Sequence, residues 1–227
     1  MIFDPMYFVF VLPAFLLGLW AQLRIQIAYG AAQQMAAPLS GAAAARHILD
    51  SAGLHDVGIE QTPGHLSDHY DPSEKVLRLS PEVYQSRSLA AVGIAAHEAG
   101  HAIQDAAGYA PLVIRNAVVP LAGFGSSAGV IMIIVGAILG MVAWLIWLGI
   151  ALFGAVVFFQ VVNLPVEFNA SRRAKDQLVQ LGIVNAEELR YVNKVLDAAA
   201  LTYVAATLQA LFTLLYYIWR FGGASRD

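Results

Sequence analysis

The residues of this chain best suited to chemistry are the five from His97 to His101, which read His-Glu-Ala-Gly-His. Two histidines four positions apart on a helix lie on the same face, so both imidazoles can reach one metal ion. A glutamate directly after the first histidine points beside that ion, where it can take a proton from a bound water. This His-Glu-x-x-His spacing is the pattern of zinc peptidases, and it predicts a hydrolytic metal site.

The alternative is a pair of solvated histidines on an exposed helix face. The eight residues before His97 are all apolar or glycine, which predicts a helix that is buried on several faces. A buried imidazole needs partners for its nitrogens, and a metal ion supplies one. We expect this helix to run from Leu89 to about Ala106, capped by Ser86 or Ser88 and ended by Gly108.

The composition predicts a membrane protein. Hydrophobic residues make up 59% of the chain and charged residues only 13%, which is too apolar for an ordinary soluble domain. Long apolar runs, of which the first contains Asp4 as its only charge, predict four transmembrane helices, at about Phe3–Leu23, Ala117–Leu139, Met141–Val162 and Ala199–Trp219. Gly140 is the best place for a turn between the two middle helices, because glycine weakens a helix there.

The distribution of charge predicts the orientation in the membrane. Asp4 precedes the first apolar run and Arg24 follows it, which is typical of an uncleaved anchor with its N-terminus outside the cytoplasm. Eleven of the thirteen lysines and arginines lie in residues 24–115 or 172–194, and basic residues favour the cytoplasmic side. Four crossings would therefore place both polar segments in the cytoplasm and both chain ends outside.

The composition also limits the partners and the metal ligands. The net charge of −3 gives no reason to expect nucleic acid as a partner. The chain has no cysteine, so it has no disulfide framework, and a metal site must use histidine, aspartate or glutamate. The lipid bilayer is the partner that the composition itself predicts.

The predicted fold is that of a mostly α membrane protein, with four transmembrane helices and a small α+β catalytic domain on the cytoplasmic side. In the first polar segment we expect a helix at Ala42–Ala52 capped by Ser40, strands at Val57–Glu60 and Lys75–Leu79, and a helical turn opened by Pro81. The resulting organisation is an N-terminal anchor (1–23), a cytoplasmic domain (24–116), a transmembrane hairpin (117–162), a cytoplasmic segment (163–198), and a C-terminal transmembrane helix with a short tail (199–227).

A third metal ligand is required, because catalytic zinc usually takes three protein ligands and keeps one position open for water. Glu167 is the best candidate. Pro165 is expected to start a helix and to place Glu167 in its first turn, where the alternative role is to complement the helix dipole. Asp105 lies four residues after His101, further along the same helix axis, which suits a supporting or capping residue better than a ligand.

Four blocks of sequence carry a resemblance to a known family: His97–Gln104, Pro165–Ser171, Leu66–Pro72 and Ala199–Ala206. With them the chain resembles the YugP-type membrane zinc metallopeptidases of bacteria. The resemblance implies a zincin-like, more narrowly gluzincin-like, catalytic domain. It also implies a zinc ion, one per chain by the three-ligand argument, held by His97, His101 and Glu167, with Glu98 as general base.

The glutamate block is more distantly similar to that of HtpX and the CAAX prenyl proteases, where Glu-x-x-Ala-Asp is usual. Ser171 stands where that aspartate would orient a zinc-binding histidine. We therefore expect the orienting group here to be Ser171, Asp105 or Asn169.

The motif and the resemblance together predict a zinc-dependent endopeptidase in the bacterial inner membrane, a multi-pass protein whose site faces the cytoplasm. Its substrates would be peptides or proteins, membrane proteins among them. The oxyanion needs a donor besides the metal, and the candidates are His69, Tyr70 and Tyr203. His69 is otherwise a turn residue and Tyr203 a membrane-interface aromatic. The strand Lys75–Leu79 is a candidate sheet edge for an extended substrate.

Two other classes of function remain open. One is a membrane scaffold or chaperone-like protein with a structural zinc site, which would have no use for Glu98 as a base and would prefer a closed fourth ligand. The other is a transporter or channel, which would require ionisable groups inside the spans.

Overall fold

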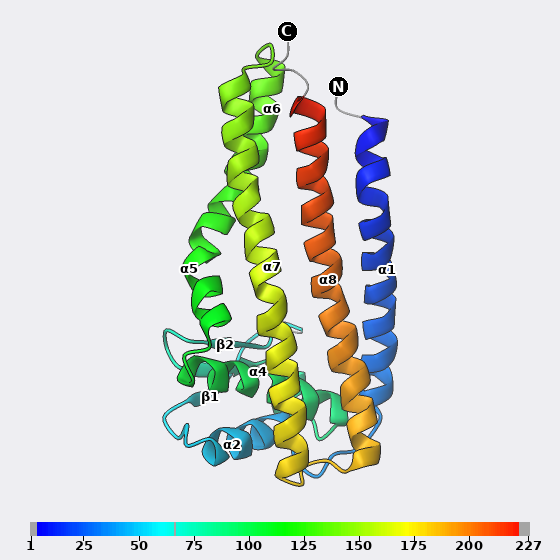
Figure 1. The fold of residues 1–227 in the computed structure, drawn as a ribbon. Coiled ribbons are helices and arrows are strands. Elements are labelled where there is room, and N and C mark those ends of the chain that lie inside the picture. Colours follow the sequence, from blue (N-terminus) through cyan, green and yellow to red (C-terminus); the bar gives the residue numbers. More distant parts are fainter. Residues whose placement is uncertain (1–3, 66, 223–227) are drawn as a thin grey trace. The chain divides into compact units, whose positions relative to one another are not determined.

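The computed structural model is mostly helical, and it describes residues 4–65 and 67–222 (Figure 1). Phe3 of the first predicted span, Leu66 of one family block and the tail after Gly222 lie outside this part. The chain divides into two compact units. Unit 1 comprises residues 1–20, 113–164 and 202–227, and unit 2 comprises residues 21–112 and 165–201.

Among the described residues, four helical segments are long and apolar enough to cross a membrane: Pro5–Gln33, Ala110–Ile138, Ala143–Gln180 and Ala186–Gly222. They are α1, then α5 with α6, then α7 and α8, and each contains a predicted span. The second segment consists of α5 (Ala110–Phe124), a π-helical stretch η1 (Gly125–Gly129) and α6 (Val130–Ile138). The prediction of four apolar helices is confirmed by length and composition.

The predicted hairpin between the two middle spans lies in unit 1. Its turn uses positive φ angles, 89° at Gly140 and 67° at Met141, and α7 begins at Ala143. The two arms approach closely, because a Cβ on Gly129 would lie 2.9 Å from the carbonyl oxygen of Gly149. Such close packing through small residues is typical of helices in membranes, where dispersion contacts replace the hydrophobic effect.

The expectation for Pro165 is wrong. α7 runs without a break from Ala143 to Gln180, so Pro165 lies inside the helix and Glu167 is not in a first turn. A proline removes one backbone donor and bends a helix, but ending the helix in an apolar segment would leave many more backbone groups without partners. Because Glu167 lies far from a helix start, complementing the helix dipole no longer explains it.

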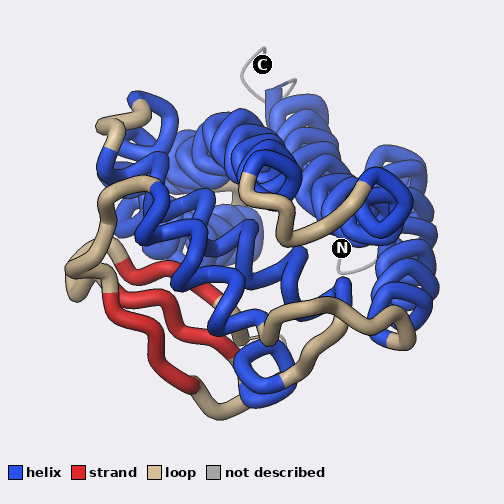
Figure 2. The backbone as a smooth tube through the Cα atoms, turned by 90° about the horizontal axis from the view of Figure 1, so that it is seen from below, coloured by secondary structure: helices blue, strands red, loops and turns tan. Residues whose placement is uncertain are grey.

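Unit 2 contains a three-stranded sheet with the order β1-β3-β2, drawn in red in Figure 2. β1 (Gly58–Gln61) and β3 (Val76–Leu79) were predicted, and they pair in parallel. β2 (His69–Asp71) was not predicted, and it pairs antiparallel to β3. β3 is therefore the central strand, and the expectation that Lys75–Leu79 forms a sheet edge is wrong. In the described part of the chain, the edges are β1 and β2.

Three helices of unit 2 begin where local sequence signals predict. α2 (Gly41–Ser51) is capped by Ser40, which accepts a hydrogen bond from the Ala43 N–H, and α3 (Pro81–Gln85) begins at its proline. α4 (Leu89–Ala106) contains the two motif histidines. Ser88, and not Ser86, caps it by accepting from the Ala91 N–H at 3.2 Å. α4 packs against α2 in a core whose largest fully buried side chains include Ile48, Leu49, Leu77, Leu79, Leu89 and Leu178.

Candidate metal centre

α4 is buried along most of its length, as its apolar sequence predicts. Ala95, Ala96 and Ala99 have no exposed surface, and His101 is only 7% exposed. The motif therefore does not lie on a solvated helix face. An imidazole in such surroundings requires polar partners.

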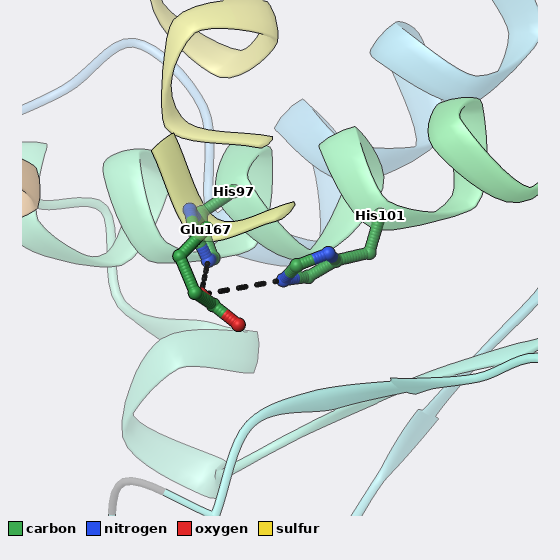
Figure 3. A group of neighbouring side chains, drawn as sticks. All are labelled: His97, His101 and Glu167. Atoms are coloured by element: carbon green, nitrogen blue, oxygen red, sulfur yellow. Dashed lines mark hydrogen bonds and ion pairs between the residues drawn. The ribbon is translucent and has the colours of Figure 1, made fainter. Parts of the chain in front are cut away.

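The partners come from α7, within unit 2. The Oε2 atom of Glu167 lies 3.2 Å from Nε2 of His97 and 3.7 Å from Nε2 of His101. Both rings point at the carboxylate, which reaches them from α7 (Figure 3). One ligand atom from each of the three residues lies within 4.8 Å of the other two. The structure thus brings together the three side chains that the sequence nominates as ligands, all of them buried.

Glycine at position 100 permits this approach. A Cβ at Gly100 would lie 2.7 Å from the carbonyl oxygen of Ala170 in α7, closer than a carbon atom and a carbonyl oxygen can pack. Gly93, two turns earlier on the same face, would place a Cβ 3.1 Å from Cγ1 of Val192 in α8. Gly100 therefore lets the backbone of α7 come near enough for Glu167 to reach the histidines.

The three donors fit a zinc ion. Tetrahedral zinc with ligand distances of about 2.0–2.1 Å separates its ligand atoms by about 3.3–3.4 Å, close to the 3.2 and 3.7 Å between Glu167 and the two histidines. The Nδ1 atoms are engaged elsewhere, that of His97 with Oγ of Ser171 at 3.1 Å and that of His101 with Oε1 of Gln104 at 3.0 Å. Both Nε2 atoms are therefore directed to the same point.

The electrostatics favour positive charge at this point. Burial lowers the pKa of His97, but the hydrogen bond with Glu167 and the charges of Glu98 and Glu167 outweigh burial and raise it. A divalent cation would supply the positive charge in place of a proton. The charge balance and the spacing of the donors therefore agree.

Glu98 lies beside the cluster and is also buried. Its carboxylate accepts a hydrogen bond from the backbone N–H of Tyr70 in β2. Burial raises the pKa of Glu98 to about 7, and the charge of Glu167 adds to the rise, while His97 opposes it. A carboxyl group with a pKa near neutrality is suited to accept and return a proton.

The other predicted site residues divide into those near the cluster and those with other partners. Ser171 contacts His97 directly. Asn169 accepts a hydrogen bond at Oδ1 from Nε2 of Gln104 at 3.0 Å, and Gln104 in turn contacts His101. Asp105 accepts a hydrogen bond from the Tyr70 hydroxyl at 3.0 Å. His69 is an exposed residue whose Nδ1 bonds the carbonyl oxygen of Ser67 at 2.8 Å, and Tyr203 belongs to unit 1.

Gln104 was not predicted as a site residue, although its position carries a signal. It follows His97 by seven positions and His101 by three, so it lies on the same helix face. A glutamine on the face that carries two candidate ligands, at the end of an apolar helix, requires buried partners. In the structure it has no exposed surface.

Fold and site together describe a membrane protein in which the two histidines of a His-Glu-x-x-His sequence and Glu167 could hold a metal ion. Residues 7–222 match the family described as "Putative neutral zinc metallopeptidase", and the chain belongs to this family. It is 46% identical over 219 residues to the "Putative membrane protease YugP" of Bacillus subtilis (strain 168). The aligned region covers 95% of this chain and 97% of that protein. No solved structure matches the chain. The predicted family resemblance is confirmed.

Proposed function

We propose that this protein is a membrane-embedded endopeptidase that uses one zinc ion, held by His97, His101 and Glu167, to hydrolyse peptide bonds. The observation that carries the proposal is the buried cluster of these three donors with Glu98 beside it. Three protein donors leave a fourth position for water, as catalytic zinc sites do. A structural site, as a scaffold would have, closes that position and needs no adjacent base.

In this proposal each residue of the site has a separate task. Zinc would lower the pKa of a bound water and polarise the scissile carbonyl. Glu98 accepts the water proton and returns it to the leaving amine. The N–H of Tyr70 holds the Glu98 carboxylate in place. The side chains of Ser171 and Gln104 orient the rings of His97 and His101 from the far side.

Two of the three candidate donors to the oxyanion, Tyr70 and His69, already have other hydrogen-bond partners. The Tyr70 hydroxyl donates a hydrogen bond to Oδ2 of Asp105. His69 bonds a carbonyl oxygen through Nδ1, so that nitrogen carries the hydrogen and Nε2 donates only when the ring is protonated. We therefore assign neither Tyr70 nor His69 as the oxyanion donor.

The edge strand β2 supports an extended peptide as substrate. It pairs on one side with β3, and the backbone N–H of Tyr70 at its centre reaches Glu98. Because Glu98 accepts the Tyr70 N–H, an extended peptide along this edge would pair with the other backbone groups of β2 that face away from β3. The scissile bond of this peptide would lie near Glu98. Backbone pairing of this kind does not select particular side chains in the substrate.

The purified protein is expected to contain about one zinc ion per chain, because the three donors converge on a single point. The variant with His97→Ala and His101→Ala should contain none, since it loses two of the three donors. Elemental analysis after removal of loosely bound metal measures the ratio. His55→Ala, which changes an exposed histidine bonded to Asp50, is the matched control. Full zinc in the double variant would place the site elsewhere.

We propose that the site faces the cytoplasm of a bacterial cell and that both chain ends lie outside, from the distribution of basic residues. Single cysteines at Ser73 and Asp176, both exposed, should then react with a membrane-impermeant thiol reagent only after the membrane is opened. A cysteine at Leu139, which is 65% exposed beside the hairpin turn, should react in intact cells. The chain has no cysteine of its own, so the introduced cysteine is the only thiol of the protein that the reagent can label. The reverse pattern would overturn the orientation.

A further inference from the structure

The amide of Gln104 has an orientation that its partners determine. Its Nε2 lies 2.8 Å from the carbonyl oxygen of Val166 and 3.0 Å from Oδ1 of Asn169. A backbone carbonyl only accepts hydrogen bonds, so the amide nitrogen must face it. Arg173, which only donates, lies 2.8 Å from Oδ1 of Asn169 and identifies that atom as oxygen as well. Both N–H groups of the Gln104 amide are therefore used.

The amide oxygen must then face His101, where Oε1 lies 3.0 Å from Nδ1. Since an amide oxygen only accepts, Nδ1 of His101 carries a hydrogen. A neutral imidazole has only one such hydrogen, so its Nε2 carries a lone pair, and this atom lies 3.7 Å from Oε2 of Glu167. The hydroxyl of Ser171 can donate or accept, and it therefore imposes no such choice on His97.

Gln104 also connects two of the three proposed ligands. It belongs to α4 with His101, and its contact with Val166 attaches it to the backbone of α7 directly before Glu167. A shift of either helix along the other would break one of these bonds. The side chain has no exposed surface, so water does not compete for its partners.

We propose that Gln104 is a positioning residue of the metal centre, which holds His101 as the Nδ1–H tautomer and keeps its Nε2 at a constant distance from Glu167. This inference rests on the proposed zinc site and adds a residue to it. Gln104 acts through His101 and not on the substrate. Partners of this kind typically change metal affinity by about 10–100-fold.

The test is the zinc affinity of the full-length protein in detergent, measured by competition with a chromophoric chelator, together with the melting temperature of the metal-free form. Gln104→Met keeps length and burial but removes all three hydrogen bonds, and it should weaken zinc about 10–100-fold. Gln104→Glu keeps the acceptor for His101 and loses the donors to α7. It should lower the melting temperature while its zinc affinity stays closer to wild type than that of Gln104→Met.

Ser88→Ala is the matched control, because it removes a buried hydrogen bond of the same helix at the N-cap, far from His101. It should lower the melting temperature without changing zinc affinity. A Gln104→Met variant that binds zinc as tightly as wild type, or a Gln104→Glu variant that loses as much affinity as Gln104→Met, overturns the positioning role. Failure of the wild type to bind zinc at all overturns the proposed function, and the inference with it.

Discussion

Replacing Glu98 with glutamine is expected to reduce peptide cleavage by about 10²–10⁴-fold, the usual contribution of a general base. Glutamine has nearly the same size and can still accept the N–H of Tyr70, so the local structure should persist. Glu98 is not one of the three clustered donors, and zinc content should therefore stay at the wild-type level. The measurement is the cleavage rate of a fluorogenic peptide by purified protein with equal zinc loading.

The control for this variant is Glu60→Gln, which changes an exposed glutamate of β1 and should leave cleavage unchanged. Wild-type cleavage by Glu98→Gln would exclude Glu98 as the base. Cleavage by neither wild type nor variant, with zinc bound in both, would instead favour a scaffold with a structural metal. The comparison of wild type with Glu98→Gln thus distinguishes a zinc peptidase from a scaffold with a structural metal. The inactive Glu98→Gln form can also serve to trap substrates.

Replacing Glu167 with glutamine or alanine is expected to abolish cleavage and to weaken zinc binding by more than about 100-fold. Residues that only support a ligand change affinity by about 10–100-fold, and removal of a ligand should exceed that. Glutamine preserves the shape of the side chain but removes the charge that faces His97 and His101. Zinc affinity by chelator competition and the cleavage rate are the two measurements.

The protein should remain folded in both forms, because Glu167 lies in the interior of α7 and alanine favours a helix. Asp105→Asn is the matched control. Asparagine can still accept the Tyr70 hydroxyl, and zinc content should not change. Normal zinc and normal cleavage in Glu167→Ala would exclude this ligand, and Asp105 would then be the next carboxylate to test.

Local features of the sequence were sufficient for much of the fold. The bounds of α4 follow from Ser88 at its N-cap and from an apolar run that ends near Gly108, and the structure agrees with them. The hairpin turn at Gly140 and the cap of α2 at Ser40 were also predictable. Each of these depends on a few neighbouring residues, whose steric and hydrogen-bonding preferences act without the rest of the chain.

Two expectations failed because they depended on distant segments. Pro165 is a common first residue of a helix, but the apolar sequence on its N-terminal side keeps α7 continuous through it. β3 was expected at an edge, yet β1 pairs with it in parallel and β2 pairs on its other side. A strand of three residues such as β2 carries almost no periodic signal, and strand order depends on long-range pairing.

The sequence by itself determined which side chains are proposed to carry the chemistry. The i, i+4 spacing of His97 and His101 puts two imidazoles on one face, and Glu98 follows from its place beside them. It also nominated Glu167, seventy residues after His97. Only the tertiary structure decided that Glu167 reaches both rings, that Gly100 permits this approach, and that Gln104 holds His101. The physical reason is that helical periodicity is a local property, whereas a ligand set drawn from two helices depends on how closely their backbones pack.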